Sequence, residues 1–445
     1  MRFYNRENEL LVLKQLWDQV DESGKLIVLT GRRRLGKTLL ATEFAKNCPF
    51  FYFFIEKKPE VLLCDDFLLL LKEKKFPLPI IGEIRRFKDL FTYLLEYAKK
   101  EKIVVIIDEF QEFFNINPAV YSELQNLWDS YKQEAKMLFI AVGSVYSLMH
   151  KIFEDKKEPL FGRADRTIKL HAFSIHTLAT LLKDHEISKL EDIFDFYVLT
   201  GSVPKYLDIL MTNGVKSRDD ILSFMLSEFS PFLEEGKNFL IEEFGKEYGT
   251  YFAILELMSV GKTSRPEIES ILGRDVGGYI EKLEENYNLI YRIMPFDDKP
   301  TSRNLKFAIK DPFLNFWFRF LYRNRSAIEL KNFSYIRRII DRDYSTYCGH
   351  FLERFFRELL ALQKKYNRIG SYWESKNLNE IDIIAINDLD KEILIAEVKM
   401  NPKRLNLYEL QFKAQNIIKR YADYRVEWAG FSLNDAKKYF PLSKT

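Results

Sequence analysis

A glycine-framed loop near the start of the chain constrains the fold more than any other feature. The segment GRRRLGKT (31–38) fits the pattern GxxxxGK[ST], follows the apolar run KLIVLT (25–30) and precedes LLATEFAK (39–46), which has helical periodicity. A buried strand, a glycine loop and a helix in this order form the phosphate-binding loop of nucleoside triphosphatases. The sequence therefore predicts an α/β domain in which a buried parallel strand leads into this loop.

Each loop residue has an expected role in binding a nucleotide. Gly31 and Gly36 let backbone N–H groups curl around phosphates, and the N-terminus of the following helix favours negative charge. Lys37 is expected to reach the β- and γ-phosphates, and Thr38 to offer its hydroxyl to Mg²⁺. The predicted cofactors are ATP and Mg²⁺. The predicted ATP-binding residues of the loop are Gly31, Arg32, Arg33, Arg34, Leu35, Gly36, Lys37 and Thr38.

Two later strands complete the expected nucleotide site. KIVVIIDEFQEF (102–113) contains an apolar strand that ends in Asp108, a candidate ligand for magnesium, and Glu109, a candidate to polarise the attacking water. Because both halves of the site are present, we predict ATP hydrolysis in preference to a chance glycine turn. MLFIAVGS (137–144) ends in Ser144, which could sense the γ-phosphate or cap the next helix.

The segment PLFGRADRTIKL (159–170) offers two candidate arginine fingers, Arg163 and Arg166. An arginine finger stabilises the negative charge that develops during phosphoryl transfer. Such an arginine can act within its own chain or on the nucleotide of a neighbouring copy, and the second case would imply a homo-oligomer. A surface salt bridge is the alternative interpretation.

Six segments occur in an order that resembles a known family. They are FYNRENEL (3–10), GRRRLGKT, VVIIDEFQEF (104–113), GSVYSLM (143–149), PLFGRADRTIKL and TGSVPKYL (200–207). The chain resembles the archaeal-type AAA+/STAND-related P-loop ATPases, which are also found in some bacteria. The resemblance implies that Arg6 lies near the adenine, and that Gly201 and Pro204 of a helical lid touch the nucleotide. It also implies a winged helix and a C-terminal domain like the PD-(D/E)XK nucleases.

The expected fold class is α/β, with a P-loop, AAA+-like core, a helical lid, a winged helix-turn-helix and a restriction-endonuclease-like domain at the C-terminus. The expected boundaries are 1–174 for the ATPase core, 175–245 for the lid, 246–311 for the winged helix, 312–345 for linker helices and 346–445 for the nuclease-like domain.

Charge and aromatic residues limit how the middle of the chain could bind nucleic acid. The third helix of the expected winged helix carries Glu281, Glu284 and Glu285, which would repel phosphates. The wing, with Lys299 and Arg303, is the better contact, and a packing module between domains is the alternative. The aromatic residues of 312–345 could stack on single strands, but their helical spacing favours a core with a basic outer face.

The segment NEIDIIAINDLDKEILIAEVKM (379–400) reads as two apolar strands interrupted by charges. Folding it symmetrically about Leu389 and Asp390 places Asp382 opposite Glu397 on one face, and Glu380 opposite Lys399. Two facing carboxylates repel each other unless a cation lies between them, and Mg²⁺ prefers such oxygen ligands. Lys399 could then orient the attacking water or stabilise charge on a phosphate.

The pattern Asp…Glu-x-Lys is similar to the PD-(D/E)XK nucleases, and the resemblance adds Glu353, on a helix at 348–360, as a further metal ligand. The predicted catalytic residues are Lys37, Glu109, Arg163, Asp382, Glu397 and Lys399, and the predicted metal ligands are Thr38, Asp108, Glu353, Asp382 and Glu397. An exposed, salt-bridged hairpin would produce the same letters, and folds of this kind also serve as inactive binding platforms.

Composition places limits on location and partners. The 445 residues carry a net charge of only +3, so any binding of nucleic acid must come from local patches. The start of the chain has no apolar signal region, no apolar run is long enough to span a membrane, and Cys48, Cys64 and Cys348 are far apart in the sequence. We therefore expect a cytoplasmic protein without a membrane partner.

Two functions remain open at this stage. The first is an ATP-hydrolysing enzyme that acts on nucleic acid, with DNA as the favoured partner, through a metal-dependent nuclease-like domain. The second is an ATP-controlled molecular switch or scaffold whose nuclease-like domain is catalytically inactive and docks other molecules.

Overall fold

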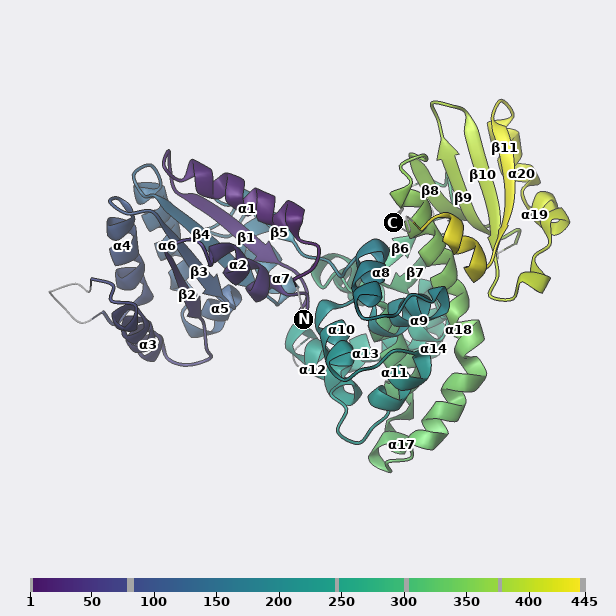
Figure 1. Cartoon of the computed structure of the whole chain (residues 1–445), viewed down its shortest axis with the longest axis horizontal. Coiled ribbons are helices and arrows are strands. Elements are labelled where there is room, and N and C mark those ends of the chain that lie inside the picture. The colour runs from purple at the N-terminus through teal and green to yellow at the C-terminus, as the bar shows by residue number, and fades with distance from the viewer. Residues whose placement is uncertain (1–2, 78–83, 245–247, 300–303, 375–377, 441–445) are drawn as a thin grey trace. The chain divides into compact units, whose positions relative to one another are not determined.

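The computed structural model describes residues 3–77, 84–244, 248–299, 304–374 and 378–440. These residues form two compact units, one within 2–172 and the other within 173–445. Figure 1 labels their helices and strands. None of the helices in the described ranges is long and apolar enough to cross a membrane.

The first unit is built on a five-stranded sheet in the order β2-β3-β4-β1-β5. All neighbouring strands pair in parallel. The strands are β1 (Lys25–Thr30), β2 (Phe50–Phe54), β3 (Ile103–Asp108), β4 (Met137–Gly143) and β5 (Arg166–Lys169). Because the strands are parallel, their carboxyl ends meet at one edge of the sheet. The predicted α/β domain with a parallel sheet is therefore confirmed.

Helices cover both faces of this sheet, and every residue of β3 and β4 is buried as a result. The helices are α1 (Glu7–Gln19), α2 (Lys37–Ala45), α3 (Glu60–Glu73), α4 (Phe87–Ala98), α5 (Phe113–Ile116), α6 (Ala119–Tyr131) and α7 (Tyr146–Glu154). Alternate residues of the central strands join a Phe-rich core with α3, α4, α6 and α7. Helices α1 and α2 pack against each other and against β1, β3 and β4.

The second unit begins with helices and a small antiparallel sheet. The first helices are α8 (Ile175–Asp184), α9 (Leu190–Thr200), α10 (Pro204–Thr212), α11 (Arg218–Met225) and α12 (Phe232–Phe244). They are followed by α13 (Tyr248–Ser259), α14 (Arg265–Leu272), α15 (Gly277–Glu281) and the antiparallel pair β6 (Ile290–Ile293) and β7 (Lys306–Ile309). Three helices and a hairpin are the elements expected for 246–311, and Arg303 of the expected wing lies outside the described residues.

The aromatic segment that follows is a core, as its spacing indicated. It contains α16 (Pro312–Phe316), α17 (Arg325–Glu329) and α18 (Phe333–Leu362). Its buried aromatic side chains are Phe313, Phe316, Trp317, Phe318 and Phe320. The expected boundary between 345 and 346 falls inside α18, because Tyr344, Tyr347 and Phe351 continue one buried stripe through it.

The C-terminal sheet has four strands in the order β11-β10-β9-β8. They are β8 (Arg368–Tyr372), β9 (Ile381–Asn387), β10 (Glu392–Val398) and β11 (Arg425–Phe431), and the helices α19 (Leu407–Lys413) and α20 (Gln415–Ile418) connect the parallel pair β10 and β11. Strands β9 and β10 pair from Glu392 with Asn387 to Ala396 with Ile383. One step further along this register brings Glu397 opposite Asp382, so the predicted register is confirmed.

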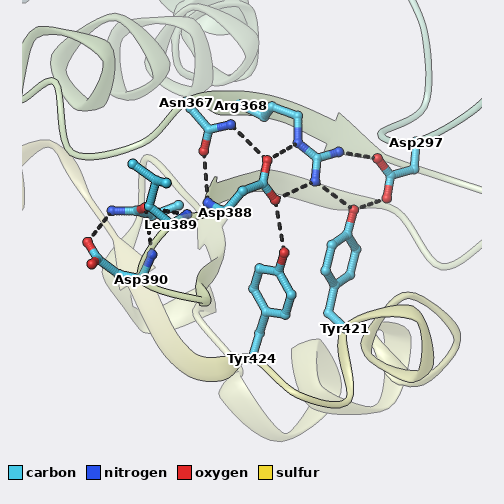
Figure 2. Close-up of polar contacts among 9 residues, drawn as sticks. Asp297, Asn367, Arg368, Asp388, Leu389, Asp390, Tyr421 and Tyr424 are labelled. Atoms are coloured by element: carbon cyan, nitrogen blue, oxygen red, sulfur yellow. Dashed lines mark hydrogen bonds and ion pairs between the residues drawn. The ribbon is translucent and has the colours of Figure 1, made fainter.

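Figure 2 shows how the β6–β7 hairpin is fastened to this sheet. The guanidinium of Arg368, on β8, donates to Asp297 Oδ1 at 2.6 Å and to Asp388 Oδ1 at 3.0 Å. Tyr421 donates to Asp297, and Tyr424 donates to Asp388 Oδ1 at 3.0 Å. The hydrogen bonds from Arg368 are the largest cause that lowers the pKa of Asp388, to about 2. One arginine thus joins Asp297, in the loop between β6 and β7, to the turn between β9 and β10.

Further contacts continue this attachment along β8. The backbone N–H of Phe296 donates to Ser371 O at 2.7 Å, and Trp373 Nε1 donates to Asn304 Oδ1 at 3.1 Å. Lys306 of β7 forms an ion pair of 2.8 Å with Glu380. Glu380, which we expected opposite Lys399, is therefore bound by the β6–β7 hairpin. The expected wing is therefore packed on the C-terminal sheet at both of its described ends.

Candidate functional site

The glycine loop has the backbone that a phosphate-binding loop needs. It runs from the carboxyl end of β1 to Lys37, the first residue of α2, and Gly36 has the left-handed φ of 85°. Gly31 has a φ of 143°, and a Cβ there would lie 2.7 Å from the carbonyl oxygen of Leu170. Any larger residue at Gly31 would therefore push the loop away from β5.

The two residues predicted to serve magnesium lie together. The hydroxyl of Thr38 donates to Asp108 Oδ2 at 2.5 Å, across the intervening strand β4. Asp108 is only 4% exposed, and it also accepts a hydrogen bond of 2.9 Å from Tyr52. Burial and the Asp108 carboxylate raise the pKa of Tyr52 above its usual value. A hydroxyl and a carboxylate at the phosphate loop form a donor set that fits Mg²⁺.

Lys37 and Arg6 hold the loop from two sides. The buried ammonium of Lys37 donates to the carbonyl oxygens of Gly31 at 2.8 Å and Arg32 at 3.0 Å. Arg6 donates to the carbonyl oxygens of Leu35 at 3.3 Å and His171 at 2.8 Å, and burial lowers its pKa. The structure thus brings Arg6 to the loop, and its place near the adenine, which the resemblance implied, stays a prediction.

Glu109 lies at the end of β3 among polar side chains. It has a left-handed φ of 54°, which turns the chain immediately after the strand. Ser144 donates to its two carboxylate oxygens at 2.7 and 3.0 Å, and Gln111 also donates to it. Arg33 of the loop donates to Ser144 at 3.4 Å. The N-cap of α7 is Val145, so Ser144 serves Glu109 and not the helix.

Arg163 is not brought to the phosphate loop of its own chain. It donates to Asp129 on α6 at 2.7 and 3.0 Å and to the carbonyl oxygen of Pro159 at 2.7 Å. Three residues further along the chain, Arg166 of β5 pairs with Ile27, near the amino end of β1. The loop begins at Gly31, at the other end of that strand, about 13 Å from Ile27 at the usual rise per residue. Arg163 thus forms the salt bridge of the alternative interpretation, and its action as an arginine finger, in its own chain or on a neighbouring copy, stays a prediction.

Gly201 and Pro204 belong to the second unit. Gly201 ends α9 with a left-handed φ of 60°, and a Cβ there would press on Asp311 and lie 3.2 Å from Pro312. Pro204 is buried at the start of α10. Within this unit both residues serve packing between helices, and their contact with a nucleotide stays a prediction.

The C-terminal sheet gathers two carboxylates around one ammonium. Lys399 Nζ lies 3.0 Å from Asp382 Oδ2 and 3.4 Å from Glu397 Oε1. Asp382 Oδ2 also accepts a hydrogen bond of 2.8 Å from the backbone of Val398. Burial opposes the charge of Lys399, but the two carboxylates raise its pKa above its usual value. The ammonium of Lys399 therefore lies beside both carboxylates, and a divalent ion between them stays a prediction.

A third carboxylate approaches this cluster from α18. Arg357 lies 3.7 Å from Glu353 and donates to the carbonyl oxygen of Asp382 at 3.1 Å. Burial, followed by repulsion from Asp382, raises the pKa of Glu353 to about 7. Within the described ranges, no three acidic, histidine or cysteine side chains are gathered closely enough to hold a metal ion as they stand. The residue types nevertheless fit a divalent ion, since three carboxylates converge on one end of the sheet.

Several contacts at both sites were not foreseen from the sequence. Tyr52 and Gln111 contact the acidic pair of the first unit, and Asn406 donates from its backbone to Glu397 Oε2 at 3.0 Å. Lys413 lies 4.0 Å from Glu397 Oε1. The residue types gave no signal, because each contact depends on which strand or helix becomes a neighbour.

These features define the class of the first unit. A glycine loop with a buried lysine, a Thr–Asp pair and a glutamate at one edge of a parallel sheet are the site of a P-loop nucleoside triphosphatase. Residues 3–210 match the family described as an ATPase domain predominantly from Archaea. Residues 317–411 match a second family, of archaeal and bacterial proteins of unknown function.

Two relatives and one solved structure show how far the likeness extends. An uncharacterized protein of Methanocaldococcus jannaschii is 28% identical over 460 residues, 99% of this chain and 95% of that protein. An uncharacterized ATP-binding protein of the same organism is 25% identical over 70% of this chain and 99% of its own length. A Walker-type ATPase of Pyrococcus abyssi has a TM-score of 0.54 at 19% identity, over 71% of this chain and 96% of that chain.

Proposed function

We propose that the protein hydrolyses ATP to control its action on nucleic acid, with DNA as the preferred substrate, and that its C-terminal domain cleaves phosphodiester bonds. The observation that carries this proposal is the cluster of Asp382, Glu397 and Lys399 at one end of β9 and β10. Two acids and an amine on one face form the donor set used for metal-assisted phosphodiester hydrolysis. The sheet with a long helix before it and a helical crossover agrees with a nuclease-like fold.

In the ATPase unit, Lys37 is placed to leave the loop carbonyls and bind the terminal phosphates. Thr38 and Asp108 would hold Mg²⁺, which supplies charge neutralisation on the phosphates when bound. Glu109 would orient the attacking water, and Ser144 fixes the direction of its carboxylate. Arg33 of the phosphate loop contacts Ser144, so a bound terminal phosphate could alter the hydrogen bond between Ser144 and Glu109 through Arg33.

In the C-terminal site, Asp382 and Glu397, with Glu353 behind them, would hold a divalent ion, which supplies a nucleophilic water and a Lewis acid when bound. Lys399 would then turn from the carboxylates toward the phosphate. Its ammonium can stabilise the negative charge that grows as the water oxygen bonds to phosphorus and the ester oxygen leaves. The hydrogen bond from Val398 keeps Asp382 in place while Lys399 moves.

Residues 246–311 have the element order of a winged helix, and we infer that they act mainly as a packing module. Glu284 and Glu285 lie on the third helical segment, with Glu284 paired to Arg292 at 2.8 Å. An acidic surface repels the phosphates of a major groove. The hairpin is held by β8 through Arg368 and Phe296, so its contribution is to position the C-terminal sheet.

A plasmid-nicking assay with Mg²⁺ or Mn²⁺ tests the proposal. We expect nicking by the wild-type protein and a loss of at least about 100-fold in Asp382→Ala and Lys399→Ala, because each removes one charge of the cluster. Asp390→Ala and Lys391→Ala change the same residue types at the far end of the hairpin, and both should retain nicking. Equal nicking by all four variants would attribute the cleavage to a contaminant and end the proposal.

One observation favours a second function. Lys399 forms ion pairs with both Asp382 and Glu397, as a lysine does in a structural ion-pair cluster. In this case the protein is an ATP-controlled switch or scaffold, and its C-terminal domain docks other molecules. The absence of nicking on supercoiled, linear and single-stranded substrates by the wild-type protein would support it.

A further inference from the structure

Helix α19 carries two aromatic side chains that are left in solvent. Tyr408 is 87% exposed and Phe412 is 68% exposed, and their spacing of four residues places them on one face of the helix. Leu410, on the other face, is buried in the core that α19 shares with β9 and β10. The aromatic side chains of residues 313–320, by contrast, are all buried. Two neighbouring exposed rings are therefore a surface that lacks an obvious role in folding.

This aromatic face is tied directly to the acidic cluster. The backbone N–H of Asn406, the N-cap of α19, donates to Glu397 Oε2 at 3.0 Å. Lys413, in the last turn of the same helix, lies 4.0 Å from Glu397 Oε1. Figure 1 shows α19 beside the strands β10 and β11, whose sheet carries the cluster. A molecule that covers Tyr408 and Phe412 would thus lie next to Asp382 and Glu397.

The chain between β10 and the end of α19 is strongly basic. Residues 399–413 contain four basic side chains, Lys399, Lys403, Arg404 and Lys413, and one acidic side chain, Glu409. Lys403 and Arg404 are exposed on the short turn Pro402–Arg404, which Asn401 caps. Lys399 and Lys413 are paired with nearby carboxylates, so the positive charge that this segment offers at the surface comes from Lys403 and Arg404.

We propose that α19 and the turn before it bind the unpaired nucleotides of a single-stranded nucleic acid. Tyr408 and Phe412 would each stack on a base, and Lys403 and Arg404 would contact the backbone phosphates. The rings start about 6 Å apart along the helix axis, so that each can meet a separate base. Only an unpaired base offers a free face to a ring, which favours single strands over duplexes. The proposal rests on the proposed function only in placing the bound strand at a cleavage site.

Binding measured in EDTA tests this surface without any cleavage. The probes are a fluorescent single-stranded DNA oligonucleotide, an RNA of the same sequence and the matching DNA duplex, followed by anisotropy with the full chain. We expect the double variant Tyr408→Ala/Phe412→Ala to bind one or both single strands at least about 10-fold more weakly, and the duplex as wild type does. Tyr408→Phe, which keeps the ring, should bind as wild type does.

Phe229→Ala is the matched control, since Phe229 is 91% exposed and lies elsewhere in the second unit. Lys403→Gln/Arg404→Gln should weaken binding and reduce the slope of log K against log salt by about 1.4, as the loss of two phosphate contacts predicts. Wild-type affinity of Tyr408→Ala/Phe412→Ala for both single strands, as expected if the rings dock a protein instead, would overturn the proposal. An equal loss for the duplex would also overturn it.

The nicking assay separates this inference from the proposed function. If the wild-type protein nicks nothing, but the aromatic variant loses single-strand binding, the surface stands and the nuclease does not. If the wild-type protein nicks DNA, but the aromatic variant binds single strands normally, the nuclease is supported and the single-strand surface is not. ATP hydrolysis by the aromatic variant should equal that of the wild type, which checks the first unit, and an unchanged thermal unfolding profile should show that the second unit is folded.

Discussion

Single side chains set the geometry of the ATPase site. Glu109 follows the buried strand β3 in a left-handed conformation, so its carboxylate turns back toward the carboxyl edge of the sheet. Ser144 binds both of its oxygens, and Gln111 binds one of them. Since two donors fix one carboxylate, the direction in which Glu109 can accept a proton from water is restricted before any nucleotide arrives.

We predict different losses for Glu109→Gln and Ser144→Ala. Glu109→Gln keeps the shape and removes the base, and its kcat for ATP should fall by about 100-fold to 10,000-fold. Ser144→Ala removes one charge-assisted hydrogen bond, and its kcat should fall by about 10-fold. Steady-state ATP hydrolysis and nucleotide binding measure both, and binding should change little in either variant. A Glu109→Gln protein with wild-type kcat would exclude Glu109 as the base.

At the scale of elements, the hairpin β9–β10 was predictable and the surroundings of its acids were not. Alternation along the strands fixed which charges share a face, because a slip by one residue would bury Asp382 against apolar neighbours. The position of Lys399 between the acids depends on side-chain rotamers, and the pattern of letters contains no information on them. The hydrogen bond from Asn406 at the start of α19 to Glu397 forms only because the connection from β10 to β11 passes over the face of the sheet that carries Glu397.

Two further features depend on pairing between distant parts of the chain. The sequence around Arg163 indicates only that this arginine lies near a strand. The pairing of Arg166 with Ile27 places Arg163 near the amino edge of the sheet. Likewise, the expected boundary at 345 lies within α18, where a buried stripe continues from Tyr344 to Phe351. Local patterns predict helices and strands well. The position of a residue in the folded sheet or helix packing depends on pairing between distant parts of the chain.

The junction of α9 and α10 yields a prediction at this scale. Gly201 and Gly214 both have left-handed backbones, with φ of 60° and 69°. A Cβ at Gly201 would press on Asp311, which caps α16. A Cβ at Gly214 would meet nothing within 4 Å. Gly214→Ala should cost about 1 kcal/mol of unfolding free energy, and Gly201→Ala about 2–4 kcal/mol. Thermal denaturation compares them, and equal midpoints would contradict the packing role.

At the scale of the whole molecule, the two sites belong to different compact units that join between Ala172 and Phe173. Any control of one site by the other must therefore pass through this junction or through contacts that change with the nucleotide. Arg6 holds the carbonyl oxygens of Leu35, in the phosphate loop, and His171, at the end of the first unit. It is placed to transmit the state of the loop to the chain that enters the second unit.

This arrangement predicts that the two activities can be uncoupled. Lys37→Ala should abolish ATP binding and, with it, any difference in nicking between samples with and without ATP. Arg6→Ala should keep part of the ATP hydrolysis but lose most of that difference, because the loop no longer holds His171. Lys46→Ala, an exposed change just beyond α2, is the control and should behave as wild type. Nicking by Lys37→Ala that still responds to ATP would show that the phosphate loop does not control the C-terminal site.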